Sequence, residues 1–521
     1  MPRLRLSLTI PGAVSLGAYE GGALAALILA AKALGEDKLV IDSIASASAG
    51  SMTALLTARS LLRDVDPVAL LKAAWVDNVS FEAMKTHSTA SLLSSAALMK
   101  MAEEVFGPGG IPEGGRASWQ QEPVRVSMAL AGLAGLTYQL PDLVKNTAVT
   151  ASTYLDWYQV TLTNEVASDG YLTHAKAAIA SGSNAFGFPA ERLNRSDDRA
   201  QYEAAGLEPP GDWWFSYTDG GTVDNQPLGR TIDLAQGIES GGDDRLYLLI
   251  HPDSPQQKPS TVWSGSNATP PPWVRTGLHA LGMSRSQSIY DDLRRLEKTN
   301  SRVQWVDAVA RAVRTGVDAG IEAGNLAEGQ ANELRVGLMA ALSGALGDLR
   351  GLEEHVERVA GREPAPRPVD PGGEWSDVLD TLVHAASGLE GRQPVKVEVV
   401  SPAVDTSDAR PECKEVAGAF LGHFGGFFDI KFRRSDFALG YRNMRDWMDP
   451  GLAGYLPGVA PSELSAAFDT VAQRYVQLGL GDVCWGGASL GALSFLEKLS
   501  LVGLALHSAR VVFHDALHGG V

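Results

Sequence analysis

The beginning of the chain alternates segments typical of strands with segments typical of helices, and no other feature constrains the fold as strongly. Residues 4–10 and 39–47 are apolar runs of strand length, whereas residues 18–34 and 49–62 have the length and composition of helices. Gly35 stands where the first helix should end. Strand, helix, strand, helix in this order predicts a parallel sheet with helices on its faces.

Further strands are expected along both halves of the chain. The apolar runs at 124–131, 157–163 and 246–251 continue the strand pattern, and a run at 395–400 is expected to rejoin the sheet. The Gly/Pro-rich residues 107–118 are expected to form a loop.

The second half of the chain has a different composition. Residues 253–273 and 362–373 contain many Pro residues, which is typical of linkers, and the segment between them has a helical pattern with charged faces. The residues after the late strand are expected to be mainly helical. We therefore expect an α/β core at 1–255, a helical insertion at 256–394 and a C-terminal region at 395–521.

The charge of the chain excludes some classes of partner. Lys and Arg number 44 against 61 Asp and Glu, which gives a formal net charge of −17. Nucleic-acid phosphates need a basic protein face, so this balance argues against a nucleic-acid partner. It also argues against electrostatic docking on an anionic membrane.

The cysteines and the N-terminal residues suggest a cellular setting. Two cysteines, Cys413 and Cys484, are too few for a disulfide framework, so we expect a reducing, cytoplasmic environment. Residues 1–10 have the pattern of a strand rather than that of a signal peptide. The apolar residues 21–31 end at Lys32 and are too short to span a bilayer.

The run Ser46-Ala47-Ser48-Ala49-Gly50 lies between an expected strand and an expected helix. This is the setting of a nucleophile elbow, in which a sharp turn exposes a serine above the end of the sheet. Ala49 and Gly50 are small enough for such a turn, whereas Ser46 stands where the usual pattern has glycine. Amides at the start of the following helix would help to stabilise an oxyanion. The same pattern also occurs in plain α/β packing, so a structural turn is the alternative.

A Gly-rich run at residues 11–22 lies between the first strand and the first helix. Gly12 and Gly17 have the spacing of a P-loop, but Ala18-Tyr19 replaces the Lys-Ser/Thr pair that contacts phosphate and magnesium. An oxyanion-hole loop needs only free backbone amides. The residues that could supply them are Gly12, Ala13 and Val14. A tight turn beneath a packed helix is the alternative.

The run Asp219-Gly220-Gly221-Thr222-Val223-Asp224-Asn225-Gln226-Pro227 supplies an acid that a catalytic serine could use as its base. A lone Asp-Gly-Gly is normally a turn. Its glycines, however, would let this loop approach the serine loop closely. Ser48 and Asp219 are far apart in sequence, so they would meet only through the fold.

These motifs, in this order, resemble the patatin-like lipid acyl hydrolases. That family has a Gly-rich oxyanion loop after its first strand, then a Gly-x-Ser-x-Gly elbow, then an Asp-Gly-Gly/Ala. The run at 219–227 is a close match, and residues 180–189 resemble the family's Ala-Ser segment that ends in Pro. The resemblance covers about residues 4–251. A bacterial subgroup of patatin-related proteins is also similar in the C-terminal region, at residues 424–428, 433–434 and 436–443.

The resemblance implies a three-layer α/β/α sheet with a helical insertion and a mainly helical C-terminal region. It also implies ester hydrolysis by a Ser–Asp dyad, with Ser48 as nucleophile, Asp219 as base and no metal or other cofactor. The implied oxyanion donors are Gly12, Ala13, Val14 and Ala49, and the supporting residues are Ser46, Gly50, Gly17, Gly220, Gly221 and Asn225. The family has a basic residue where Leu16 stands, so a direct charge is missing from this loop.

Other residues resemble catalytic or metal-binding sites. Ser489 lies in a better Gly-x-Ser-x-Gly than Ser48, but too few residues follow it for the strands, acid and histidine of an α/β-hydrolase. We expect that segment to pack between helices. His514 and His518 have the spacing of two metal ligands, although terminal surface histidines are far commoner. His251 is expected to be a polar residue at a strand end rather than part of a triad.

The resemblance therefore implies a phospholipase A-like enzyme that acts on lipid or phospholipid acyl esters. Two alternatives stay open: a non-catalytic lipid- or partner-binding protein on the same fold, and an acyl transferase that excludes water. The substitutions at Ser46, Val14 and Leu16 keep the first alternative open. Any peripheral membrane contact would depend on apolar side chains, with residues 92–101 as candidates that would otherwise belong to the core.

Overall fold

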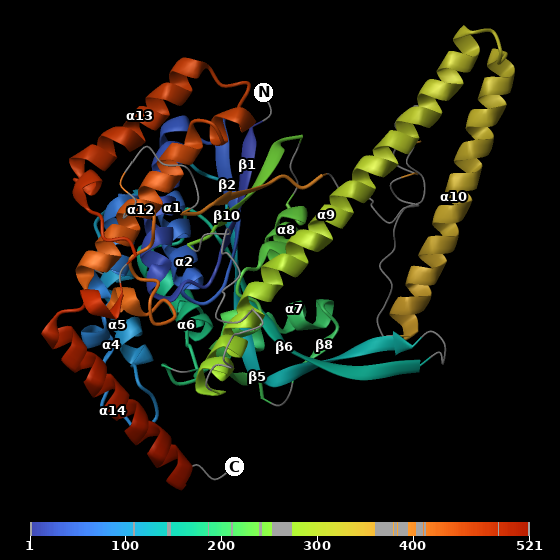
Figure 1. The fold of residues 1–521 in the computed structure, drawn as a ribbon. Helices are drawn as coiled ribbons and strands as arrows, with labels where there is room; N and C mark the ends of the chain where they lie inside the picture. The colour runs from blue at the N-terminus through green and yellow to red at the C-terminus, as the bar shows by residue number, and fades with distance from the viewer. Residues whose placement is uncertain are drawn as a thin grey trace, which may run out of the picture.

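The computed structural model of the chain describes residues 3–107, 110–142, 147–185, 187–209, 212–238, 242–252, 273–359, 394–402, 413–487 and 489–518, and the single residues 379, 383 and 410. Both expected Pro-rich linkers lie almost wholly outside the described residues. Figure 1 shows a central sheet with helices on both faces and a long helical pair that projects away from it.

Within the described residues, nine strands form one mixed sheet in the order β11-β10-β1-β2-β5-β9-β7, with β6 and β8 also paired to β5. The strands from β11 to β5 are parallel, and β6, β8 and β9 run antiparallel to β5. The strands are β1 (Leu4–Ile10), β2 (Leu39–Ser46), β5 (Val124–Asp142), β6 (Thr147–Leu162), β7 (Glu191–Asn194), β8 (Leu207–Glu208), β9 (Trp214–Asp219), β10 (Asp244–Ile250) and β11 (Val397–Val400).

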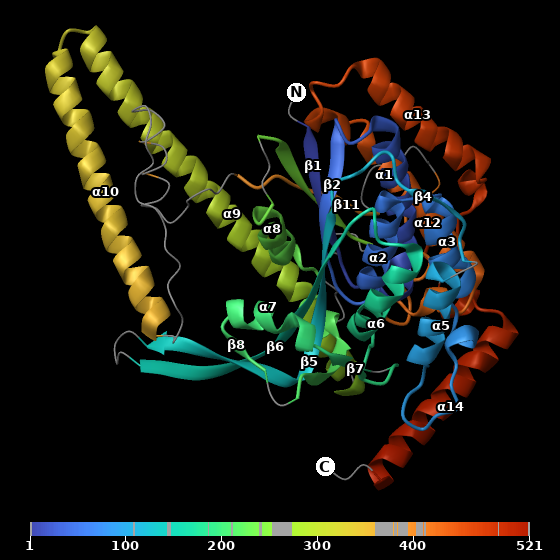
Figure 2. The same ribbon diagram turned by 180° about the vertical axis from the view of Figure 1, so that it is seen from behind.

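The helices form a layer on each face of this sheet and a further layer outside α1 (Figures 1 and 2). The helices α1, α2 and α6 lie on one face, and α8 lies on the other, where α9 packs against it. The helices are α1 (Gly17–Leu34), α2 (Ala49–Leu62), α3 (Pro67–Lys72), α4 (Phe81–Met84), α5 (Ser95–Phe106), α6 (Tyr171–Ser181), α7 (Arg199–Ala204), α8 (Leu228–Gln236), α9 (Trp273–Glu322), α10 (Glu328–Val359), α12 (Ile430–Met448), α13 (Pro461–Gln477) and α14 (Phe495–His518).

The three-layer architecture and most expected elements are confirmed, and the late strand does rejoin the sheet beside β10. Two expectations were wrong. The sheet is parallel only from β11 to β5, because β6, β8 and β9 pair antiparallel with β5. The outer half of the long β5–β6 hairpin is largely exposed and mixes polar residues with apolar ones such as Leu133, Leu140 and Val149. The expected loop at 107–118 contains β4 (Glu113–Arg116), which pairs with β3 (Arg63–Val65) in a separate two-stranded sheet.

The helix α1 is buried on all sides because α2, α3, α12 and α13 enclose it. Its close crossing with α12 depends on two glycines. A Cβ at Gly22 would lie 2.0 Å from the Phe437 carbonyl oxygen, and one at Gly440 would lie 1.9 Å from the Tyr19 carbonyl oxygen. This crossing fastens the C-terminal region to the helix that follows the Gly-rich loop.

Within the described chain, one helical stretch, Val14–Leu34, is long and apolar enough to cross a membrane by length and composition alone. It is longer than residues 21–31, because Lys32 lies within the helix and does not end it. Within the fold, 89% of its most apolar window is buried, as in the core helix of a folded domain.

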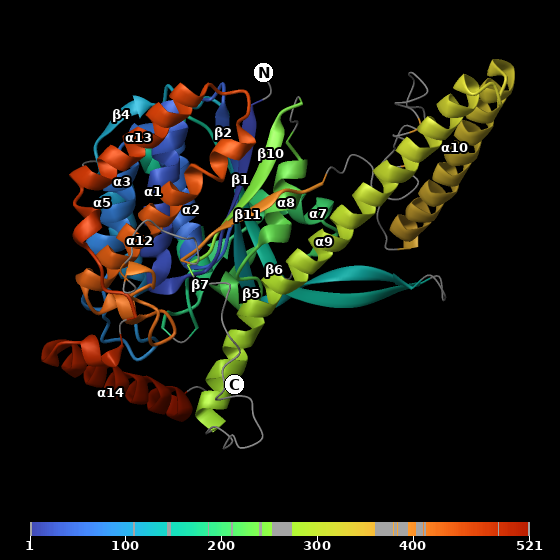
Figure 3. The ribbon, with the colours of Figure 1, turned by 45° about the horizontal axis from the view of Figure 1, so that its top comes forward.

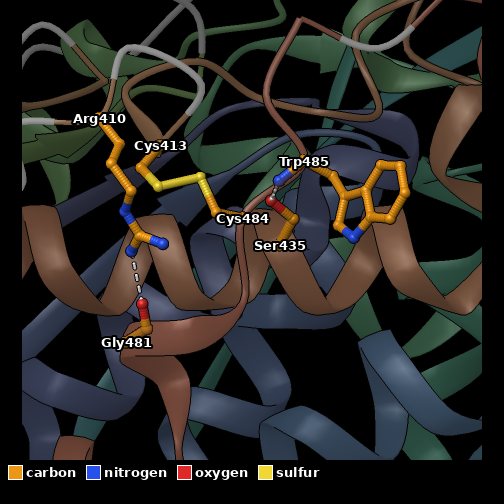
Figure 4. Close-up of a disulfide and its surroundings, with 6 residues drawn as sticks. All are labelled: Arg410, Cys413, Ser435, Gly481, Cys484 and Trp485. Atoms are coloured by element: carbon orange, nitrogen blue, oxygen red, sulfur yellow. Dashed lines mark hydrogen bonds between the residues drawn. A yellow bond between two sulfur atoms is a disulfide. The ribbon is translucent and has the colours of Figure 1, made fainter.

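The two cysteines are joined in a disulfide, Cys413–Cys484, which lies beside α12 (Figure 4). Next to it, the Trp485 amide donates a hydrogen bond to Ser435 Oγ at 2.8 Å, and Arg410 donates to the Gly481 carbonyl oxygen at 2.6 Å. The expectation of two reduced cysteines was therefore wrong, and the argument for a reducing compartment no longer holds. Cysteine count could not reveal this pairing, because it depends on the fold that brings the two segments together.

Candidate active site

Ser48 lies in the sharp turn that joins β2 to α2. Its backbone has φ 51° and ψ −131°, a region that residues other than glycine rarely adopt. A Cβ at Gly50 would lie 2.3 Å from the Pro11 carbonyl oxygen and 2.4 Å from that of Ile10. Glycine is therefore required at the last position of the run, and the turn has the geometry of a nucleophile elbow.

The serine that replaces the usual first glycine fits because its side chain is buried and hydrogen bonded. Ser46 Oγ contacts Ser51 Oγ at 3.2 Å and donates to the Ser127 carbonyl oxygen at 3.3 Å. This departure from the usual pattern therefore leaves the turn intact.

Ser181, at the end of α6, supports the elbow from the other side. Its Oγ accepts a hydrogen bond from the Ser48 amide at 2.9 Å and donates to the Ala129 carbonyl oxygen at 2.6 Å. It also lies 2.9 Å from Ser51 Oγ. Our sequence analysis did not include Ser181 in the site, although the resemblance at residues 180–189 was the available signal.

Asp219 is the last residue of β9 and is fully buried. Its Oδ1 accepts a hydrogen bond from the Gly221 amide at 3.0 Å, and its Oδ2 accepts one from Asn184 Nδ2 at 3.3 Å. The Asp219 amide donates to the Ser183 carbonyl oxygen at 3.0 Å. The segment after α6 therefore contacts both the elbow and this carboxylate.

The sheet brings the two loops to the same edge. Strand β5 lies between β2 and β9, with Met128 opposite Ser46 and Leu130 opposite Asp219. A Cβ at Gly220 would lie 1.9 Å from the Ala129 carbonyl oxygen, so only glycine allows the Asp219 loop to pass this close to β5.

Gly12 and Asn225 join the Gly-rich loop to the other two loops. A Cβ at Gly12 would lie 2.7 Å from Ser48 Cβ and 2.2 Å from Asn225 Oδ1. A Cβ at Gly221 would lie 2.3 Å from the same Oδ1 and 3.1 Å from Asp219 Oδ1. All three motifs of the sequence therefore meet around one small volume.

The Gly12 amide is not available to an oxyanion, because it donates to the Asn225 carbonyl oxygen at 3.0 Å. Our expectation of a donor at Gly12 was therefore wrong, and this residue instead provides space beside Ser48. Ala13, Val14 and Ala49 remain as candidate donors. Val14 has φ 54°, which is unusual for a β-branched residue and turns the loop sharply at this position.

Residues 8–232 match the family model of patatin-like phospholipases. This region is a patatin-like domain. The match includes the Gly-rich loop, Ser48 and Asp219, and it indicates lipid acyl hydrolase activity at the level of the family. A comparison of the chain with curated proteins gave no match.

The C-terminal region holds the Gly-rich loop of the patatin-like domain in place. Ser15 donates two hydrogen bonds to the His423 carbonyl oxygen, one from its amide at 3.1 Å and one from its Oγ. The Gly426 amide donates to Ser15 Oγ at 3.0 Å, and Arg433 donates to the Gly426 carbonyl oxygen at 2.8 Å. The run at 424–428, to which the sequence analysis gave no role, therefore fastens the candidate oxyanion loop.

Asp436 on α12 anchors this C-terminal segment from within. Its two carboxylate oxygens accept hydrogen bonds from the Ala417 amide at 2.5 Å and the Gly418 amide at 3.0 Å. Burial raises the pKa of Asp436 to about 7, and the two amide hydrogen bonds oppose that rise.

This pKa predicts how stability depends on pH. An unfolded Asp has a pKa of about 3.9, so the folded protein keeps a proton on Asp436 that the unfolded chain releases. The resulting stabilisation is complete below about pH 4 and is lost as the pH rises through about 7. We expect the free energy of unfolding in urea to fall more steeply over this range in the wild type than in Asp436→Asn. Identical slopes would contradict the assignment.

The close packing of Gly12 predicts the effect of a single added methyl group. In Gly12→Ala the new Cβ would collide with Ser48 and Asn225, so one of these loops must shift. We expect kcat/KM for a soluble ester to fall by about 10²-fold while the protein stays folded, because small misplacements are costly in an active site. Circular dichroism should be unchanged. Wild-type activity in this variant would show that the loops do not meet as described.

An apolar cavity of about 80 Å³ lies next to the elbow. Met52, one turn after Ser48 on α2, forms part of its wall, and a Cβ at Gly182 would lie 2.9 Å from Met52 Cε and 3.6 Å from the Ser48 carbonyl carbon. The remaining lining residues come from α2, α5, α6 and the segment after α3, and they include Leu55, Trp75, Leu98, Phe106 and Ile179.

The other residues considered in the sequence analysis lie elsewhere. Ser489 is in an exposed turn before α14 and accepts a hydrogen bond from the Gly491 amide, so it is neither an elbow nor part of helix packing. His251 follows β10, and its amide donates to the Val400 carbonyl oxygen. The side chains of His514 and His518 lie outside the described residues. The described residues contain no group of three or more His, Cys, Asp or Glu placed to hold a metal ion.

Proposed function

We propose that the patatin-like domain hydrolyses lipid acyl esters through an acyl-enzyme on Ser48, with Asp219 as the general base. The observation that supports this most strongly is the conformation of Ser48, a strained serine between a parallel strand and a helix. Strain of this kind must be offset by the surrounding fold. If this position had only to form a turn, glycine would adopt the same backbone without strain. The presence of a serine here therefore supports a role for its side chain.

In this mechanism Asp219 accepts the proton of Ser48 Oγ as the oxygen attacks the ester carbonyl carbon. The tetrahedral intermediate collapses, the acyl–oxygen bond breaks, and the leaving alcohol takes the proton from Asp219. Water then attacks the acyl-enzyme, with Asp219 as base again; the bond from the acyl carbon to Ser48 Oγ breaks, the fatty acid leaves, and Ser48 Oγ takes the proton back from Asp219. The hydrogen bonds from Asn184 and Gly221 would orient the carboxylate for both transfers.

Stabilisation of the oxyanion would depend on dipoles rather than on a side-chain charge. Leu16 is fully buried and stands where the family has a basic residue. The donors we propose are the amides of Ala13, Val14 and Ala49, together with the N-terminus of α2. We expect the C-terminal contacts to Ser15 to hold this loop in place and so to compensate for the missing basic side chain at Leu16.

The substrate class follows from the cavity beside the elbow. Its wall consists of apolar side chains, which favour the acyl chain of a lipid over a polar acyl group. We propose that this cavity holds part of the acyl chain while the carbonyl carbon lies at Ser48.

An assay with chromogenic esters of increasing acyl length tests the proposal. We expect hydrolysis that improves with acyl length and requires Ser48. Binding of lipid without turnover would instead identify a non-catalytic protein on this fold. Transfer of the acyl group to an added alcohol, with little free acid, would identify an acyl transferase.

A further inference from the structure

The helix α14 carries a row of large apolar side chains that remain at least half exposed in the described structure. These side chains are 50% to 74% exposed, and their spacing places most of them on one stripe of the helix. They are Phe495, Leu496, Leu499, Val502 and Leu506, and we call this set the α14 stripe.

The opposite face of α14 attaches the helix to the protein. Leu504 and His507 are half-buried and face the segment 81–93, and His507 Nε2 lies 3.2 Å from the Ser91 carbonyl oxygen. Leu496 and Leu499, at the edge of the α14 stripe, line the same groove as these two residues but stay at least half exposed. The fold therefore leaves most of the stripe uncovered.

The segment that holds α14 is connected directly to the candidate active site. The amides of Leu92 and Leu93 donate to the Gly187 carbonyl oxygen at 3.1 and 2.8 Å. The Gly187 amide donates to the Asn184 carbonyl oxygen, and the Asn184 side chain donates to Asp219. In Figures 1 and 2, α14 lies at the end of the molecule toward which β1 and β2 run from the N-terminus.

The charges along α14 fit the interface of a lipid bilayer. Residues 499–509 contain no Asp, Glu, Lys or Arg, and the exposed cations Lys498 and Arg510 stand at the two ends of this stretch. Long cationic side chains at such positions can reach lipid headgroups while apolar neighbours enter the acyl region.

We propose that the α14 stripe docks the protein on the surface of a lipid bilayer and so brings the mouth of the Ser48 site to its substrate. This inference rests on the proposed function, since only an enzyme for bilayer lipids needs such a surface beside its site. It replaces the candidate segment 92–101, because Leu93 and Leu98 belong to the core, which was the alternative for these residues. Figure 3, in which the top of the whole molecule is turned forward, also shows α14 at the edge of the molecule.

The net charge of −17 determines which bilayer should bind best. Apolar insertion is not screened by salt, so binding to neutral phosphatidylcholine vesicles should persist as salt rises. Anionic lipid should weaken binding at low salt, because the chain as a whole is acidic.

The test compares Leu499→Glu/Leu506→Glu with the control Val336→Glu/Leu352→Glu, which changes exposed apolar residues on α10. Each pair is placed in the full chain with Ser48→Ala and sedimented with phosphatidylcholine vesicles at low and high salt. We expect the α14 pair to lower vesicle binding by about tenfold or more and the control pair to leave it unchanged. Equal binding by both pairs would overturn the proposal.

With Ser48 restored, the α14 pair should lose hydrolysis of bilayer lipid but keep hydrolysis of a soluble short-chain ester. If the wild type hydrolyses neither substrate, the proposed function fails while the binding result still decides the role of α14. Sedimentation velocity without lipid tests the alternative that a second copy of the chain binds the α14 stripe. A dimer that the α14 pair converts to monomer would show that the stripe binds a second copy of the chain and would overturn the proposal.

Discussion

Ser48→Ala is expected to lower ester hydrolysis by about 10⁴-fold or more, because it removes the proposed nucleophile. Alanine keeps the Cβ and can occupy the same strained backbone, so the elbow should stay in place. Initial rates with a soluble chromogenic ester measure the effect, and the melting temperature shows whether the fold is retained.

Ser489→Ala is the matched control for this experiment. Ser489 lies in a similar pentapeptide but in an exposed turn outside the sheet, so its loss should leave the rate nearly unchanged. A folded Ser489→Ala variant that lost activity would contradict the assignment of Ser48.

Asp219→Asn is expected to lower activity by about 10³- to 10⁴-fold while the protein still folds. The amide has nearly the same size and can still accept the hydrogen bond from Gly221, so the turn should persist. It cannot accept the proton of Ser48. Rates and melting temperatures of the variant and the wild type, measured side by side, separate loss of the base from loss of the fold.

The same mechanism predicts no response to chelators, since neither transfer of the proton requires a metal ion. Ester hydrolysis is measured before and after dialysis against EDTA. Strong inhibition that a divalent ion reverses would point to a metal-dependent mechanism and against the dyad.

Most of the sheet that positions the site was predictable, because local signals and tertiary packing agree there. The expected bounds of β1 and α2 match the structure, and those of β2 and α1 differ by one residue at one end. The strands β5 and β6 extend well beyond the expected residues 124–131 and 157–163. The outer half of their hairpin is largely exposed and mixes polar with apolar residues, so its pairing gives no clear hydrophobic pattern. The strands β7 and β8 were not expected, because they are too short to produce an alternating pattern in the sequence.

The geometry around the candidate site was predictable where it depends on a residue's own turn, and not where it depends on a distant segment. Ser48, Gly50 and Asp219 lie in loops whose sequence matches their geometry. The hydrogen bond from the Gly12 amide to Asn225 and the one from the Ser15 amide to His423 each join segments that are far apart in the chain. No spacing in the sequence could reveal them.

Labelling with a fluorophosphonate, followed by peptide mapping with mass spectrometry, tests most directly whether Ser48 is the nucleophile. Such a reagent bonds to an activated serine and not to an ordinary one. We expect one modified residue, Ser48, with loss of ester hydrolysis in proportion to labelling, and no label in Asp219→Asn. Label on Ser489, or an active protein that stays unlabelled at Ser48, would contradict this expectation.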